Sequence, residues 1–404
     1  MSEPTALCSP AADLPPDDLL REVFLRLPPE PGHLFSASLV CRHWRRLVRD
    51  PTFLRLFRAF HRTPPVLGFF QNLCSIQPHI GSYTRFVPTA AVPGFVLPDG
   101  KRMRQVLDCR HGRVLFHSDL GLHVWDPMAD DRDYIGSPQR SGGWNFTASV
   151  ICAAGHDIHI DCHSSSFHVV FVESVEDERH DHLASAHVYS SETGTWSSAT
   201  TISSPSAVTS YEASALVGNS LCWLLDFAGT GKDHILEFEL HSQRLNLIEL
   251  PDGVWDDYMF DIRLMPAEDG GIGFAQVKES SIHFWSRRID HYEGAEGWVL
   301  LKMVDLHELP YHSLAARDTW LESTVVGYAE DSNMLFLESG AGIIMINLGS
   351  MQLCEVPYAR GSSIYPYTSF YTPELHRSSG GRTIIYFYCR NNLTLSMSST
   401  TASV

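Results

Sequence analysis

Lysine is scarce in this chain of 404 residues: only four of its 30 basic residues are lysines, and the first is Lys101. The nine cysteines are scattered and form no C-x-x-C pair, which indicates a reducing compartment rather than a disulfide framework. No apolar stretch approaches the roughly 20 residues of a membrane helix. Residues 1–18 lack the basic start and apolar run of a signal peptide. We therefore expect an intracellular protein, cytoplasmic, nuclear or both, that does not bind membranes.

Motifs of common enzyme classes are also missing. No G-x-S-x-G or H-E-x-x-H occurs, and residues 229–232 lack the first glycine and final Ser or Thr of a phosphate-binding loop. One cluster has the composition of a zinc site: Cys152, His156, His159, Cys162 and His163. If residues 157–163 form a strand, Cys162 and the histidines point to opposite faces. We therefore predict no catalytic residues, no metal and no cofactor.

Charge is unevenly divided. The chain has a net charge of −17, yet residues 1–62 carry nine arginines and seven acidic residues, for +2, which leaves −19 on the remainder. An acidic chain is a poor general binder of nucleic acids or anionic membranes, because phosphate contacts need clustered cations. The acidic remainder favours a basic or mixed-charge protein partner.

The segment from Leu14 to about Phe60 has helical periodicity. Apolar residues recur at i, i+1, i+4, i+5 and i+8 in its first part: Leu19, Leu20, Val23, Phe24 and Leu27. Two prolines stop this helix, a second helical run extends over residues 34–48, and a third short helix follows Asp50 and Pro51. Three short helices cannot bury all of these apolar side chains, so the surplus indicates a partner interface. The alternative is that the helices pack onto the rest of the chain.

Two motifs in this segment have the separation found in the F-box family, which the segment resembles. Residues 14–28 match the opening helix, residues 38–48 match the second half, and residues 50–53 match the usual exit. The resemblance implies binding to the small S-phase-kinase-associated adaptor, which joins F-box proteins to a cullin–RING ubiquitin ligase.

Carried over to this chain, the family's adaptor contacts fall on eight residues: Leu14, Pro15, Leu19, Leu20, Val23, Leu27, Cys41 and Trp44. The resemblance implies that Leu14 and Pro15 insert into the adaptor and that the apolar residues of the first helix pack beside them. Cys41 and Trp44 would support the face formed by the later helices.

From Val66 onward, short alternating apolar runs replace the helical period. A layout of several strands closed by a proline recurs, with successive closing prolines 46 to 67 residues apart: Pro88, Pro138, Pro205, Pro251, Pro310 and Pro357. A spacing near 46–50 residues with insertions is typical of four-stranded β-propeller blades. Five stretches fit, and residues 66–98 and 365–389 are two further candidates, so we predict six or seven blades. A β-sandwich, the alternative, needs no recurring four-strand unit.

The same region is similar to the F-box-associated β region of plant F-box proteins, most closely those of a grass-expanded group. Residues 109–115 and 235–240 are typical of that region in form. The resemblance does not identify the target protein.

We therefore predict an α+β multidomain protein. A small α-helical F-box covers residues 13–60, an all-β propeller-like domain covers residues 66–390, and residues 1–12 and 391–404 are disordered ends. The expected function is the non-catalytic substrate receptor of an SCF-type cullin–RING ubiquitin ligase. Three alternatives remain at this stage: an F-box scaffold that recruits no cullin, a propeller enzyme with a helical cap, and a receptor for a small molecule or glycan.

Overall fold

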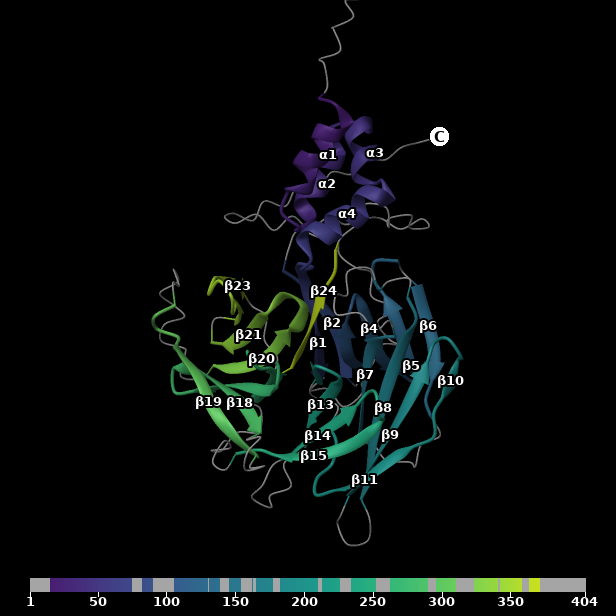
Figure 1. Cartoon of the computed structure of the whole chain (residues 1–404), viewed down its shortest axis with the longest axis vertical. Helices are drawn as coiled ribbons and strands as arrows, with labels where there is room; N and C mark the ends of the chain where they lie inside the picture. The colour runs from purple at the N-terminus through teal and green to yellow at the C-terminus, as the bar shows by residue number, and fades with distance from the viewer. Residues whose placement is uncertain are drawn as a thin grey trace, which may run out of the picture.

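The computed structural model has a helical domain above a ring of β-sheets (Figure 1). It describes residues 15–74, 82–89, 105–129, 131–138, 145–153, 162, 165–176, 182–209, 213–225, 234–251, 262–289, 296–309, 323–340, 342–357 and 363–370. The expected disordered ends, residues 1–12 and 391–404, lie outside these ranges. None of the helices in the described ranges is long and apolar enough to cross a membrane.

Four helices form the N-terminal domain: α1 (Asp17–Leu25), α2 (Pro31–Val40), α3 (Arg42–Val48) and α4 (Pro51–His61). Proline opens α2 and α4, where its missing N–H costs nothing. Asp17 and Asp18 lie in the first turn of α1, where negative charge is favoured. Asp50 caps α4 by accepting a hydrogen bond from the Thr52 N–H at 2.8 Å. The helix boundaries therefore follow local sequence signals.

The helical run expected over residues 34–48 is divided at Cys41, so the prediction of one continuous helix is wrong. Cys41 has an extended backbone, with φ −158° and ψ 168°. Its Sγ accepts a hydrogen bond from the Trp44 N–H at 3.4 Å, which makes Cys41 the N-cap of α3. A thiol is not among the side chains preferred at this position, so the sequence contains no cap signal to mark the break.

Six antiparallel sheets form the propeller, and we number the blades in chain order. Blade 1 contains β1 (Val66–Cys74), β2 (Ser82–Pro88) and β24 (Ile364–Thr368); blade 2 contains β3 (Gln105–Arg110), β4 (Arg113–Ser118), β5 (Gly121–Asp126) and β6 (Asp131–Gly136). Blade 3 contains β7 (Phe146–Cys152), β8 (Phe167–Glu176), β9 (His182–Ser190), β10 (Thr195–Trp196) and β11 (Thr200–Ser204).

The other three blades have four strands each. Blade 4 contains β12 (Ala215–Val217), β13 (Ser220–Leu224), β14 (His234–Glu239) and β15 (Arg244–Glu249); blade 5 contains β16 (Ile262–Pro266), β17 (Ile272–Lys278), β18 (Ser281–Ile289) and β19 (Glu296–Asp305). Blade 6 contains β20 (Thr324–Ala329), the short helix η3 (Glu330–Ser332), β21 (Met334–Ser339), β22 (Gly342–Asn347) and β23 (Leu353–Pro357).

The ring closes in blade 1, where the last described strand pairs with the first. β24 lies antiparallel to β1, with Tyr365 opposite Phe70 and Pro366 opposite Phe69. The two further candidate blades, 66–98 and 365–389, therefore contribute to one sheet, and the described blades number six. Residues 90–98 and 371–389 of these candidates lie outside the described ranges. Because closure pairs segments nearly 300 residues apart, the local repeat does not reveal it.

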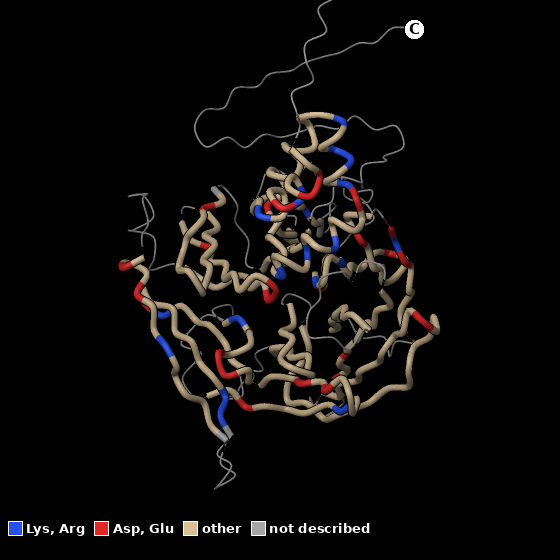
Figure 2. Tube along the Cα trace, turned by 45° about the horizontal axis from the view of Figure 1, so that its top comes forward, with Lys and Arg blue, Asp and Glu red and all other residues tan. Residues whose placement is uncertain are grey.

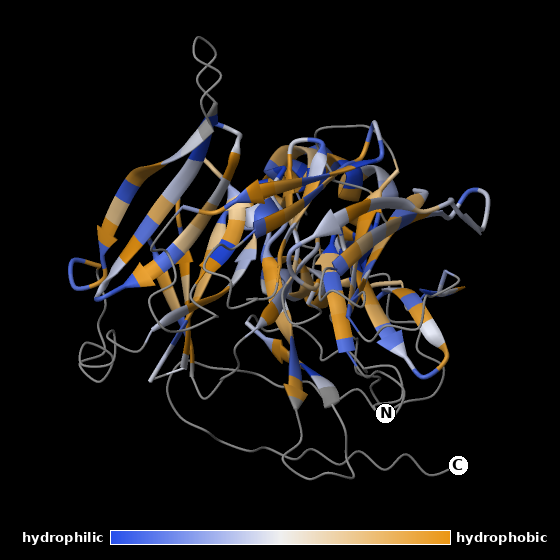
Figure 3. Cartoon of the chain, turned by 90° about the horizontal axis from the view of Figure 1, so that it is seen from below, coloured by the Kyte–Doolittle hydropathy of each residue, from blue (hydrophilic) through white to orange (hydrophobic). Residues whose placement is uncertain are grey.

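Each strand near the ring's interior supplies side chains to two inter-blade cores. On β8, Val169 and Phe171 pack in the core between blades 2 and 3, whereas Val170 and Val172 pack in the core between blades 3 and 4. Alternation sends successive side chains to opposite faces, and both faces of the blade are covered. Hydrophobic residues accordingly follow the strands around the ring (Figure 3).

The two domains contact each other through aromatic side chains. Phe370, which follows β24, is buried in the core of the helical domain with Phe24, Phe53 and Phe57. In the opposite direction, Phe35 of α2 packs against the core between blades 1 and 2. The Ser369 N–H also donates to the Pro65 carbonyl at 3.3 Å. This junction holds the helical domain against the rim of the ring.

Candidate functional site

Two apolar side chains of α1 lie on the surface rather than in the core. Leu19 and Val23 are 56% and 54% exposed, whereas Leu20 is 4% exposed. The exposed pair is spaced i and i+4, so both residues lie on one face of the helix. Phe24, also on α1, packs inward against Trp44 with ring centroids 4.9 Å apart. The helix therefore has one apolar face in the core and a second that is exposed.

The end of α2 adds two more exposed apolar residues, Leu39 and Val40, at 59% and 61%. The next helix begins two residues later, and its His43 lies 2.8 Å from the Asp17 carboxylate at the start of α1. This contact brings the end of α2 close to the start of α1. We call Leu19, Val23, Leu39 and Val40 the apolar end face of the helical domain.

Seven of the eight predicted adaptor contacts lie in the described residues, where they are exposed, half-buried or buried. Pro15, Leu19 and Val23 are exposed, and Leu14 lies outside the described residues. Leu27 and Trp44 are half-buried and pack against the helical core, and Cys41 caps α3. Leu20 belongs to the core itself. The prediction did not include Leu39 and Val40, although both fall within the motif at residues 38–48.

Arginines extend the surface beside the apolar end face. Arg42, Arg45 and Arg46 of α3 and the following Arg49 are all exposed, whereas Arg21 forms an ion pair with Asp50 at 2.7 Å. The charged positions of the helical domain and of the blades are marked in Figure 2. An apolar patch beside exposed cations suits a partner that presents both apolar and acidic groups.

A buried ionic network joins blades of the propeller near its axis. Arg110, at the end of β3, donates to both Asp108 oxygens at 2.7 and 2.6 Å. It also donates to both Glu330 oxygens at 3.0 and 2.9 Å. Further bonds reach the Ser214 hydroxyl at 2.9 Å and the Ser214 carbonyl. All five guanidinium N–H groups are thereby engaged, so this arginine has no donor left for a ligand.

The two carboxylates extend this network to further blades. Asp108 accepts from the Val150 N–H of blade 3 at 2.9 Å, and Glu330 accepts from the Leu216 N–H of blade 4 at 2.8 Å. Burial raises the pKa of Asp108, and the positive charge of Arg110 opposes that increase. The adjacent cavity measures only about 30 Å³, room for about one water molecule. This ionic network therefore has a structural role, because it connects neighbouring blades.

The Cys/His cluster of blade 3 lies only partly in the described region. His156, His159 and His163 fall outside it, while Cys152 and Cys162 are buried. The Cys152 Sγ lies 3.3 Å from the Ser165 hydroxyl. A hydrogen bond with Cys152 and burial raise the pKa of the Cys162 thiol, which disfavours the thiolate that zinc requires. Among the described residues, no group of three or more His, Cys, Asp or Glu is arranged to hold a metal.

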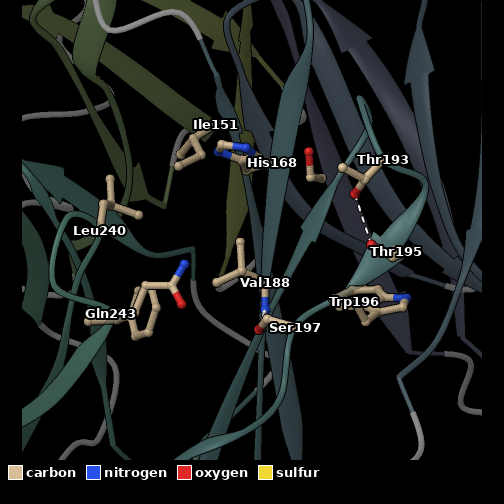
Figure 4. A pocket seen from close by; sticks show the side chains of 11 residues that line it. Ile151, His168, Val188, Thr193, Thr195, Trp196, Ser197, Leu240 and Gln243 are labelled. Carbon is tan, nitrogen blue, oxygen red and sulfur yellow. Dashed lines mark hydrogen bonds between the residues drawn. The ribbon is translucent and has the colours of Figure 1, made fainter.

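A cavity of about 260 Å³ lies between blades 3 and 4 of the propeller. Val188, His168 and Trp196 line it from blade 3, and Phe238 and Gln243 line it from blade 4. Figure 4 shows these side chains around an open space that two blades share. Its lining combines apolar and hydroxyl-bearing residues. The cavity could therefore hold a small group that has both an apolar part and a hydrogen-bonding part.

Solved structures resemble the chain only weakly. The protein YjhT is 11% identical, over 72% of this chain and 97% of that chain, with a TM-score of 0.34. A calcium-binding regucalcin of Agrobacterium tumefaciens is 11% identical, over 69% and 83%, with a TM-score of 0.31. A chain of a mitotic checkpoint complex is 12% identical, over 62% of this chain and 61% of its own length, with a TM-score of 0.33. Similarity at this level supports no transfer of function.

Comparison with family models is more specific. No curated protein matches the chain. The F-box domain model matches residues 16–56, which include most of α4 and all of α1 to α3. The model described as F-box protein AT5G49610-like, beta-propeller, matches residues 105–375, more than half of the chain. This pair of domains supports a substrate-recognition role in general, and the chain belongs to the F-box proteins with an AT5G49610-like β-propeller.

Proposed function

We propose that this chain is the substrate-recognition subunit of an SCF-type cullin–RING ubiquitin ligase. The helical domain binds the S-phase-kinase-associated adaptor, and the propeller binds a protein target. The apolar end face is the observation that carries the proposal, because its four large apolar side chains are exposed and all lie within the matched F-box. Burying such a side chain contributes about 1.5–3 kcal/mol, so a few of them suffice as binding hot spots.

In this role the chain performs no chemistry of its own. It holds a target near the ubiquitin-loaded partner and so raises the effective concentration of target lysines. Phe370 and Phe35 support this role, since they pack each domain against the other and limit relative motion of the two binding surfaces. The proposal assigns the protein to the cytoplasm, the nucleus or both.

We propose that the adaptor contacts the exposed residues of the predicted set and the two further exposed residues at the end of α2. Leu14, Pro15, Leu19 and Val23 contact the adaptor together with Leu39 and Val40. Leu20, Leu27, Cys41 and Trp44 act indirectly, because they hold the helices that present these contacts.

The test is co-purification of the adaptor and the cullin with the tagged full chain. The double substitution Leu19→Asp and Val23→Asp places charge on the end face without touching the core. We expect it to abolish recovery of both partners. Leu120→Asp, an equally exposed leucine on blade 2, serves as the matched control and keeps both.

Two results would overturn parts of the proposal. Undiminished adaptor recovery by the double variant would remove the end face as the docking site. Recovery of the adaptor without any cullin by the native chain would show a scaffold rather than a ligase receptor.

A further inference from the structure

The cavity between blades 3 and 4 lies on the side of the ring away from the helical domain. In Figure 1 the helices occupy the top of the molecule, while β9, β11, β14 and β15 lie at the bottom. The cavity of about 260 Å³ is therefore separated from the apolar end face. A target held here would not compete with an adaptor held at the end face.

Two other blade junctions are filled by a tryptophan from an outer strand. Between blades 2 and 3, the Trp196 indole of β10 donates to the Ile135 carbonyl of β6 at 3.3 Å. Between blades 4 and 5, the Trp298 indole of β19 donates to the Glu249 carbonyl of β15 at 2.8 Å. In both cases the indole packs against the inter-blade core and bonds to the outer strand of the preceding blade.

The junction between blades 3 and 4 lacks an equivalent residue. The outer strand of blade 4, β15, reads Arg-Leu-Asn-Leu-Ile-Glu and contains no aromatic side chain. The partly buried residues that pack against this core are aliphatic: Val188, Ile202, Leu216, Leu240 and Leu247. The cavity lies at this junction and extends along blade 3 from Ile151 of β7 to Trp196 of the outer strand β10.

The lining of the cavity is apolar at its base and polar, without formal charge, at its rim. Ile151 and Phe238 are buried at the base. Thr193, Thr195 and Gln243 are exposed at the rim. The described residues that line the cavity include no Asp, Glu, Lys or Arg, and His168 is the only titratable side chain among them, although the chain has a net charge of −17. A charged group would be desolvated here without a counter-charge, which is unfavourable.

Contacts on blade 3 hold the wall of the cavity in place. The Trp196 indole contacts Tyr189 and Phe171, at 5.3 and 6.2 Å between ring centroids, in the core on the other face of blade 3. The hydroxyls of Thr193 and Thr195 are hydrogen-bonded at 2.8 Å (Figure 4). A preformed wall lowers the entropy that a ligand must lose on binding.

We infer that this cavity binds an aromatic side chain, tryptophan by analogy with the neighbouring junctions, from an uncharged segment of the target protein. The side chain would occupy the place that an intrachain indole fills elsewhere in the ring. The inference rests on the proposed function, because only that function makes the protein bound in the cavity a target of the ligase. It assigns the blade 3–blade 4 junction as the point where target selection takes place.

The experiment uses the full-length chain labelled with fluorotryptophan and followed by fluorine NMR. Trp196→Phe removes one resonance and so identifies the reporter within the cavity wall. The probe is the neutral capped peptide Gly-Ser-Gly-Trp-Gly-Ser-Gly. We expect it to shift the Trp196 resonance with a Kd on the order of 1 mM, as suits a single anchored side chain. The same peptide with Ala or Lys in place of Trp should cause no shift.

Leu240→Trp tests the analogy directly, because it places an indole within the lining. We expect at least about tenfold weaker peptide binding and an increase in Tm, since a filled cavity regains packing. Leu183→Trp is the matched control: it adds an indole to β9 at an exposed position outside the cavity and should leave peptide binding unchanged. Thr193→Trp, on an exposed turn at the rim, provides a second blocking variant if Leu240→Trp does not fold.

The inference is overturned if the Trp196 resonance does not respond to the peptide, if both blocking variants bind as the native chain does, or if the lysine peptide binds equally well. Adaptor recovery by the Leu183→Trp chain and by whichever blocking variant folds should equal that of the native chain. A chain that binds the peptide but recovers no adaptor would support the cavity and contradict the ligase role, so the two failures are distinguishable.

Discussion

Phe57 of α4 and Phe370 after β24 meet edge to face, with ring centroids 6.4 Å apart and an interplanar angle of 81°. These residues lie at opposite ends of the described chain, one in the helical domain and the other directly after the strand that closes the propeller. The contact therefore couples closure of the ring to packing of the F-box. Loss of the Phe370 side chain should therefore destabilise the helical domain, although that domain lies about 300 residues away in sequence.

Phe370→Ala should destabilise the helical domain by about 3–5 kcal/mol, the usual cost of removing a buried phenylalanine side chain. Hydrogen exchange of the α4 amides reports this loss separately from the propeller. Phe60→Ala, an exposed phenylalanine on the same helix, should leave exchange nearly unchanged. Equal protection of α4 in Phe370→Ala and the native chain would contradict the coupling.

Arg110→Met should destabilise the propeller by about 3–5 kcal/mol, because it leaves the buried Asp108 carboxylate and the half-buried Glu330 carboxylate without their cation. Denaturant unfolding measures the loss. The triple variant Arg110→Met, Asp108→Asn and Glu330→Gln removes all three charges and should recover much of the stability. A loss below about 1 kcal/mol in the single variant would show that the Arg110 network contributes little to the stability of the propeller.

The stability of Arg110→Met should also depend on pH. Burial raises the pKa of Asp108, the charge of Glu330 adds to this, and Arg110 opposes both. Removing Arg110 therefore raises the Asp108 pKa further above its unfolded value. A carboxyl with a raised folded-state pKa favours folding when protonated, and this contribution is lost as the pH rises through that pKa.

The difference in unfolding free energy between Arg110→Met and the native chain should therefore narrow as the pH falls from about 7 to about 5. Denaturation midpoints of both proteins across this range provide the measurement, and acid effects shared by both cancel in the difference. If the difference in unfolding free energy instead becomes larger as the pH falls, the buried charge cannot be assigned to Asp108.

Cys41→Ser should stabilise the helical domain by about 0.5 kcal/mol, because serine is a preferred N-cap and a thiol is a weak acceptor. Cys41→Ala should have the opposite sign, since it removes the bond to the Trp44 N–H. Thermal unfolding of both variants measures the difference. Cys354→Ser, at an exposed position on β23, controls for the loss of a thiol. Equal stability of the serine and alanine variants would exclude a capping role.

Sequence patterns located the F-box and the repeating blade because both depend on local signals. The prolines that open α2 and α4 and the Asp50 cap mark the helix starts. Alternating residues such as those of β8 mark strands with two covered faces. Leu19 and Leu20 show what such local patterns do not predict. They are neighbours on one apolar stripe, yet one is exposed and the other buried, because the stripe is wider than the face that the other helices cover.

The sequence by itself determined that a basic helical F-box precedes a repeated, acidic β domain, since composition, turn residues and periodicity act over a few residues at a time. Only the tertiary structure decided that the ring has six described blades, that Phe370 packs beneath α4, and that an outer-strand indole fills two described junctions but not the one between blades 3 and 4. Each of these depends on residues that are far apart in the chain and meet only when the ring closes. The scarcity of lysine remains a property of composition, and the two described lysines, Lys278 and Lys302, both lie on blade 5.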